Sequence, residues 1–137
     1  MTLVVILLVF LGIVHFYWAL GGKRGVDKAI PTIDGKPTME PGAVVTAFVG
    51  FALIGIGGIT FALGFFDLKS VIFGKYIIYS GWLLSGIFII RSVGDFKTVG
   101  FFKQVKESNF AKYDTLYYSP LCLLLGVLFL NLSYRHT

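Results

Sequence analysis

Four apolar stretches, each long enough to cross a lipid bilayer, make up most of this 137-residue chain. They cover residues 3–20, 43–66, 71–90 and 116–132. The hydrocarbon core of a bilayer is about 30 Å thick and needs about 20 mostly apolar residues to cross it as a helix. Because that core offers no water to the backbone, every N–H and C=O must bond within the protein. The sequence therefore predicts an all-α integral membrane bundle of four transmembrane helices.

Composition leaves no room for a second domain. Hydrophobic residues make up 56% of the chain and charged residues 14%, whereas a soluble domain has about 25% charged residues. We expect residues 1–137 to form a single transmembrane helical domain. The net charge of +5 would suggest nucleic acid in a soluble protein, but here the basic residues flank apolar spans. Anionic lipid headgroups are the simpler partner for them, and we expect no nucleic acid.

The distribution of basic residues predicts the orientation. Nine of the 12 Lys and Arg lie in the first connection (21–42) and the third (91–115). Loops rich in Lys and Arg tend to stay in the cytoplasm. We therefore expect both termini outside, a bacterial cytoplasmic (inner) membrane, and a tight outer turn at 67–70 that makes the second and third helices antiparallel neighbours.

The third connection mixes aromatic residues with lysines between Lys97 and Lys112. This composition suits a short helix in the headgroup plane, with its aromatics toward lipid and its lysines toward anionic headgroups. A plain loop with a few membrane-facing aromatics fits the same residues, so both alternatives stay open here.

Small residues recur four positions apart in three of the stretches, as in Thr46/Gly50, Gly81/Ser85 and Cys122/Gly126. Such spacing lets membrane helices approach closely. Packing within one chain is the simpler interpretation, and a homodimer face is the alternative.

Polar and aromatic residues gather where three of the spans reach the predicted cytoplasmic boundary. Intramembrane polar groups are rare and often functional, although Tyr and Trp also form interfacial belts and charged residues commonly cap or snorkel at helix ends. We identify a candidate ligand-binding cluster with these members: His15, Trp18, Arg91, Asp95, Asp114, Tyr117 and Tyr118, with Trp82 midway along the third span as a further candidate.

Spacing suggests how the cluster is arranged. Arg91 and Asp95 are four residues apart and can pair if the third helix extends that far. Asp114 precedes the fourth apolar stretch, where a carboxylate can cap free N–H groups. Histidine as a residue type titrates near neutrality, so His15 is the member best suited to proton transfer.

Several chemistries lack the residues that they require. There are only two histidines and one cysteine, Cys122, so a haem, zinc or di-iron site is not expected. No catalytic triad spacing, phosphate-binding glycine loop or HExxH motif is present. We expect no metal and no cofactor.

Five segments of the chain form a recognisable set: His15–Gly22, Arg91–Phe96, Gly100–Lys103, Phe110–Asp114 and Tyr118–Cys122. Together they resemble a family of small bacterial membrane proteins catalogued as domain of unknown function 3995. The resemblance covers nearly the whole chain and implies four helices in a bacterial inner membrane. It implies no activity, substrate or catalytic residue.

Three functional hypotheses follow. The first is a protein that binds or moves a lipid-like or small amphipathic molecule at the cytoplasmic leaflet, with Arg91 holding an anionic headgroup, loop lysines assisting, and Trp18 and Trp82 contacting apolar parts. The second is an accessory or interaction subunit whose polar cluster is purely structural. The third is a membrane enzyme that uses His15 and an aspartate in acid–base roles. An ion-conducting oligomer fits less well, because few polar residues lie deep in the spans.

Overall fold

The computed structural model describes residues 1–137 and is mostly helical. Four helical segments are long and apolar enough to cross a membrane, as the sequence predicts, so the chain is a multi-pass membrane protein. The segments are α1 (Thr2–Ala19), α3 (Ala43–Phe65), α4 (Gly74–Val93) and a continuous run of α5 (Asn109–Tyr113), η1 (Asp114–Tyr118) and α6 (Ser119–His136).

The chain divides into two compact units. Unit 1 contains Met1–Lys23, Pro41–Leu83 and Phe129–Thr137, and unit 2 contains Arg24–Glu40 and Leu84–Leu128. Each unit is described by itself below.

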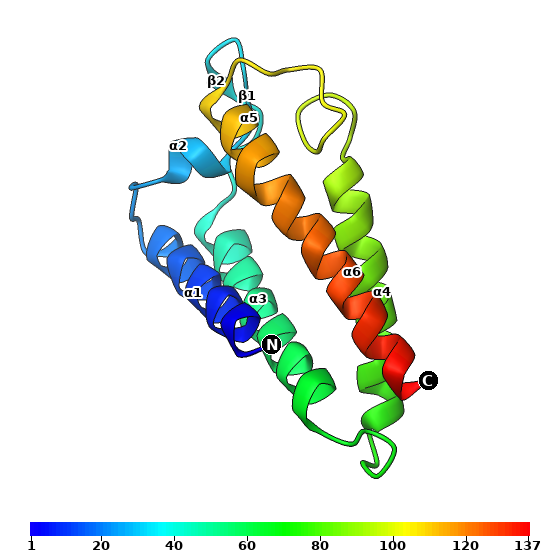
Figure 1. Ribbon diagram of the computed structural model, residues 1–137. Coiled ribbons are helices and arrows are strands. Elements are labelled where there is room, and N and C mark those ends of the chain that lie inside the picture. The colour runs from blue at the N-terminus through cyan, green and yellow to red at the C-terminus, as the bar shows by residue number, and fades with distance from the viewer. The chain divides into compact units, whose positions relative to one another are not determined.

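In unit 1, α1 and α3 lie side by side (Figure 1). Glycines permit this contact: a Cβ at Gly12 would lie 2.7 Å from Cγ1 of Ile54 and 2.9 Å from the carbonyl oxygen of Gly50. Leu8 is 1% exposed at the same contact, where its Cβ faces Gly57. Because lipid is as apolar as the helices, close van der Waals contact replaces the hydrophobic effect as the force between them.

The other end of unit 1 is held by hydrogen bonds. The imidazole Nε2 of His136 lies 2.9 Å from the carbonyl oxygen of Leu63. A Cβ at Gly81 would collide with Ser133 and Leu63, so α3, α4 and α6 approach closely there. The carboxylate of Asp67 accepts a hydrogen bond of 3.2 Å from the Lys69 N–H in the turn between α3 and α4.

In unit 2, α4 and α6 meet through small residues. The Ser85 hydroxyl donates to the Gly126 carbonyl over 2.8 Å, and a Cβ at Gly126 would lie 2.6 Å from Cγ1 of Ile89. Small residues in both units thus serve packing within one chain, while the homodimer face stays a prediction. Gly55 and Gly58 have open space beside them.

The first connection forms a short helix and a hairpin in unit 2. Helix α2 (Val26–Ala29) precedes β1 (Thr32–Ile33), which pairs antiparallel with β2 (Lys36–Pro37). Asp34 and Gly35 join the strands with φ angles of 51° and 76°. Both values are positive, as a two-residue hairpin turn requires, and the Asp-Gly pair suits them.

The third connection takes the plain-loop form of its two alternatives over residues 94–108, and the fourth span starts earlier than the sequence predicts. It has no helix of its own between residues 94 and 108, and the fourth span begins at Asn109 rather than at residue 116. The Ser108 hydroxyl accepts a hydrogen bond of 3.0 Å from the Ala111 N–H and caps the helix. Hydropathy places the helix start too late because this first turn carries polar residues.

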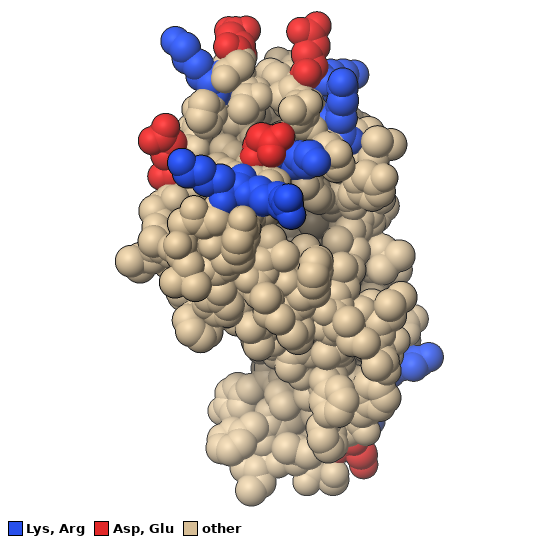
Figure 2. Space-filling view, turned by 90° about the vertical axis from the view of Figure 1, so that its left-hand side faces the viewer, with Lys and Arg blue, Asp and Glu red and all other residues tan.

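The surface agrees with a membrane location. In the view of Figure 2, the charged side chains gather at the loops, and the surface of the helices is nearly free of charge. Bulky apolar side chains such as Leu3, Phe48 and Leu83 are each at least 65% exposed. In a bilayer such side chains would contact lipid.

Candidate functional site: an ionic cluster around Asp114

A buried carboxylate is the centre of the candidate site. Asp114 is fully buried on the helix that forms the fourth span, and three groups donate to it. Oδ1 accepts from Nη2 of Arg91 over 3.0 Å. Oδ2 accepts from Nζ of Lys103 over 3.0 Å and from the Gly100 N–H over 2.8 Å. The Asp114 carboxylate therefore joins the end of α4 to the following loop.

The helix widens to π-helical geometry from Asp114 to Tyr118. Pro120 follows and has no N–H for the carbonyl of Leu116, and its ring would crowd that carbonyl in a regular α-helix. A local π turn relieves this conflict, and such turns are frequent at functional sites. Asp114 is consequently part of a second helical turn and not the N-terminal cap that its position in the sequence suggests.

Lys103 is the main residue that the sequence analysis missed as a cluster member. It is 3% exposed, and its ammonium also donates to the Gly100 carbonyl over 2.9 Å and to the Thr115 hydroxyl over 2.6 Å. The sequence grouped it with the loop lysines that we expect near lipid headgroups, whereas in the structure its ammonium is bonded within the protein. Three acceptors satisfy all three donors of the ammonium, which is what burial of a charge requires.

Arg91 is only partly satisfied. Its Nη2 donates to Asp114, but Nη1 is buried and has no hydrogen-bond partner. The Arg91 side chain is 32% exposed overall, so part of it stays accessible. Two cations around one carboxylate leave the cluster with a net charge of +1.

Asp95 does not pair with Arg91, because α4 ends at Val93 and the helical spacing stops there. Its carboxylate instead accepts from the N–H groups of Lys97, Thr98 and Val99 over 2.8–3.0 Å. Slight burial raises the pKa of the Asp95 carboxyl, but these bonds and one from the Thr98 hydroxyl outweigh it and hold the pKa well below its ordinary value. Asp95 organises the loop and does not contact the cluster.

The two tyrosines face different partners. The Tyr118 hydroxyl donates to the Lys28 carbonyl over 3.0 Å and so ties the fourth span to α2. Tyr117 is 60% exposed and stacks on Tyr113, with 5.9 Å between the ring centroids. Neither hydroxyl bonds to Asp114.

The remaining candidates belong to unit 1. The imidazole Nδ1 of His15 lies 2.7 Å from the Leu11 carbonyl oxygen one turn earlier. The His15 ring packs edge-on against the Trp18 ring, with 5.0 Å between the ring centroids. Trp82 is 39% exposed and donates from Nε1 to the Thr137 hydroxyl over 3.4 Å. Of the predicted cluster, the structure therefore brings Arg91 and Asp114 together.

A small basic pocket adjoins the cluster. It has a volume of about 350 Å³ and lies between the loop and the start of the fourth span. Its polar lining comes from three lysines and a threonine, and its apolar lining from an aromatic and two aliphatic side chains: Lys103, Lys106, Lys112, Thr115, Phe101, Ala111 and Leu116.

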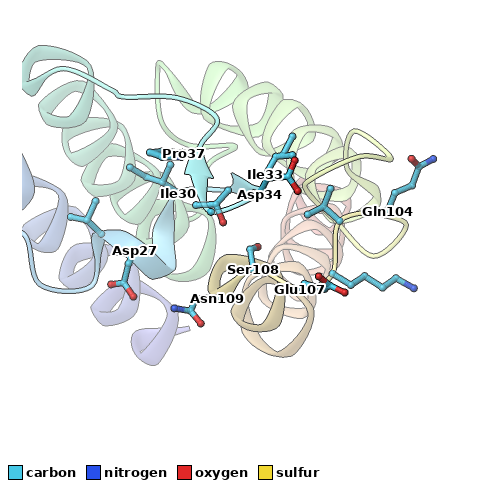
Figure 3. Close-up of a pocket in the computed structure, with 14 residues that line it drawn as sticks. Asp27, Ile30, Ile33, Asp34, Pro37, Gln104, Glu107, Ser108 and Asn109 are labelled. Carbon is cyan, nitrogen blue, oxygen red and sulfur yellow. The ribbon is translucent and has the colours of Figure 1, made fainter.

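A larger cleft of about 890 Å³ lies elsewhere in unit 2. Side chains from the first connection, among them Asp27, Ile30 and Ile33, face Ser108 and Asn109 from the third across it (Figure 3). Its carboxylates are not buried, and no group of three or more His, Cys, Asp or Glu side chains in the structure could hold a metal ion. Of the two buried charged residues of unit 2, Lys103 lines the basic pocket and Asp114 is bonded to Lys103.

One signal could have indicated Lys103 in advance. Asp114 lies close to an apolar stretch, and a buried carboxylate needs cationic partners. Lys103 directly follows two phenylalanines in the segment Gly100–Lys103. The sequence offers other lysines nearby, however, and only the path of the loop selects among them.

The chain matches a known family model over most of its length. A family model described as "Protein of unknown function (DUF3995)" matches residues 8–129, so the chain belongs to this family. Comparisons with curated proteins and with solved structures give no match.

Proposed function

We propose that this DUF3995 member binds an anionic amphiphile at the cytoplasmic leaflet of a bacterial inner membrane, through the basic pocket beside Asp114. The observation that supports this most directly is the lining of the pocket, in which the exposed Lys106 and Lys112 lie beside the buried Lys103. Lysine ammonium groups attract anionic headgroups. A phosphate or carboxylate headgroup supplies the negative charge that complements these lysines.

The pocket lining fits the two ends of an amphiphile. Lys106 and Lys112 are exposed and add positive charge at the rim, next to the net +1 of the cluster. Phe101 and Leu116, 40% and 66% exposed, offer apolar surface for a hydrocarbon chain. Basic pockets beside membrane helices bind anionic headgroups in this way.

The orientation in this proposal comes from the loops. The pocket lies in the connection that carries more basic residues than any other, and such connections tend to stay in the cytoplasm. A role for His15, Trp18 and Trp82 at the apolar part of the ligand stays a prediction.

A second candidate function has its own support. Both oxygens of Asp114 and all three donors of Lys103 are satisfied within the protein. This is what a purely structural cluster in an accessory subunit requires, and it needs no ligand.

Native mass spectrometry of the purified protein in mild detergent tests the proposal. Phosphatidylglycerol, phosphatidylcholine and oleate serve as probes, and they separate a phosphate ligand from a carboxylate ligand. The Lys106→Gln/Lys112→Gln variant should bind phosphatidylglycerol or oleate more weakly, by about fivefold for each lysine, because a basic residue near anionic lipid contributes about 1 kcal/mol. A role for Arg91 in holding the headgroup stays a prediction, because Arg91 does not line the pocket.

The matched control is Lys36→Gln/Lys69→Gln, which removes two exposed lysines that do not line the pocket. It should leave binding unchanged. Equal affinity for the neutral and anionic probes, or an equal loss in the control, would contradict the proposal and favour the structural cluster.

A further inference from the structure

Two exposed phenyl rings stand outside the membrane spans. Phe96 is 58% exposed and Phe102 is 63% exposed, and their centroids lie 6.3 Å apart. Both belong to the loop over residues 94–108. A loop that faced only water would not require exposed aromatic rings. They form an apolar pair at the surface of unit 2, which we name the Phe96/Phe102 pair.

Phe96 also has an unfavourable backbone. Its φ angle is +63°, a region that glycine and asparagine adopt readily and that a bulky side chain rarely adopts. Such a conformation costs on the order of 1 kcal/mol or more. Neither burial nor backbone preference accounts for a phenylalanine here.

The loop returns to the depth of the last turn of α4. The Phe101 N–H donates to the Ser92 carbonyl over 2.8 Å, and a Cβ at Gly100 would collide with the Val93 carbonyl. Phe102 therefore lies beside the end of a membrane span. The headgroup region extends about 5–8 Å beyond the hydrocarbon core on each side, which includes this level.

The loop is held rigidly in this position. Asp95 accepts three backbone N–H bonds within the loop, and Asp114 accepts a fourth from Gly100. The Lys97 carbonyl accepts from the N–H groups of Gln104 and Val105 over 3.0 and 2.9 Å. A fixed loop can present two rings to a surface with little loss of conformational entropy.

We propose that the Phe96/Phe102 pair inserts into the headgroup region of the same bilayer that the four helices span, and sets the depth of the loop at the interface. Lys97 and Lys106, both exposed, flank the pair and match anionic headgroups. This inference does not depend on ligand binding in the basic pocket, because the two rings do not line it.

The test is fluorescence quenching in vesicles of phosphatidylglycerol and phosphatidylcholine. Phe102→Trp is made with Trp18→Phe and Trp82→Phe, so that one indole reports. Lipids brominated near the headgroup should quench it at least about twofold more strongly than they quench Gln104→Trp in the same background, because an inserted ring contacts lipid directly. Gln104 is an exposed residue of the same loop and is the matched control.

Each result of the quenching experiment either supports or overturns insertion of the Phe96/Phe102 pair. Quenching of the Phe102→Trp indole by shallow brominated lipid, with little quenching by aqueous iodide, supports insertion. Strong quenching by iodide overturns it, as does an indole that neither reagent reaches, since that result means that protein covers the pair. Phe96→Asn in the Phe102→Trp background should retain the fold and reduce the lipid quenching, because one of the two inserted rings is lost.

Discussion

In unit 1, α1 and α3 meet through close packing at glycines, whereas in unit 2 ionic bonds hold a loop against the end of α4. The Gly50 carbonyl and the Ile54 side chain both lie against Gly12, which has no side chain of its own. Around Asp114, two cations and a backbone N–H surround one carboxylate. Both regions have polar or backbone groups close together, yet they reach stability by different means.

The two contacts differ in how much stability is lost when one group is removed. Close helix packing is a sum of many small attractions, so one change removes a part of it. A buried ion pair is compensated only while all its members are present, and loss of one leaves an unpaired charge. The cluster should therefore be the more sensitive of the two regions.

The largest expected effect is at the centre of the cluster. Asp114→Asn should destabilise the protein by about 3–5 kcal/mol, because Lys103 is left buried without a counter-charge. Thermal unfolding in detergent measures this. The double variant Asp114→Asn/Lys103→Met should be less destabilised than the sum of the single variants. An Asp114→Asn protein as stable as the parent would contradict the electrostatic account.

A smaller effect is expected at the helix contact of unit 1. Gly12→Ala should cost about 1–3 kcal/mol, because its Cβ meets Ile54 and the Gly50 carbonyl at less than 3 Å. The control is Gly58→Ala, which has open space and should leave stability unchanged or raise it by about 0.5–1 kcal/mol. If both variants unfold at the same temperature, the close approach of α1 and α3 is wrong.

The smallest effect concerns Asp95 and appears only in acid. Its pKa is lowered in the folded protein, so it stabilises the fold above the unfolded pKa of about 3.9, and the contribution is lost as the pH falls toward the folded value. The difference in melting temperature between the parent and Asp95→Asn should thus be constant near neutrality and shrink below about pH 4. A difference that persists undiminished in acid would show that the charge of Asp95 has no part in holding the loop.

The sequence predicted the helices well and their ends less well. The spans were placed within three residues for α1, α3 and α4, but the fourth began too late because its first turn is polar. Arg91 and Asp114 were both identified as candidates, since charges next to apolar spans are conspicuous. Their pairing was missed, because helical spacing pointed to Asp95 and the helix ends before it.

What the sequence by itself determined is the membrane class and the four spans, because hydropathy is summed over neighbouring residues and lipid forces such segments into helices. The tertiary structure decided which charges meet. Arg91 reaches Asp114 across 23 positions and Lys103 across 11. That choice depends on a loop that returns to the end of α4, which no local pattern encodes, and on a π turn that the local sequence indicates only through Pro120.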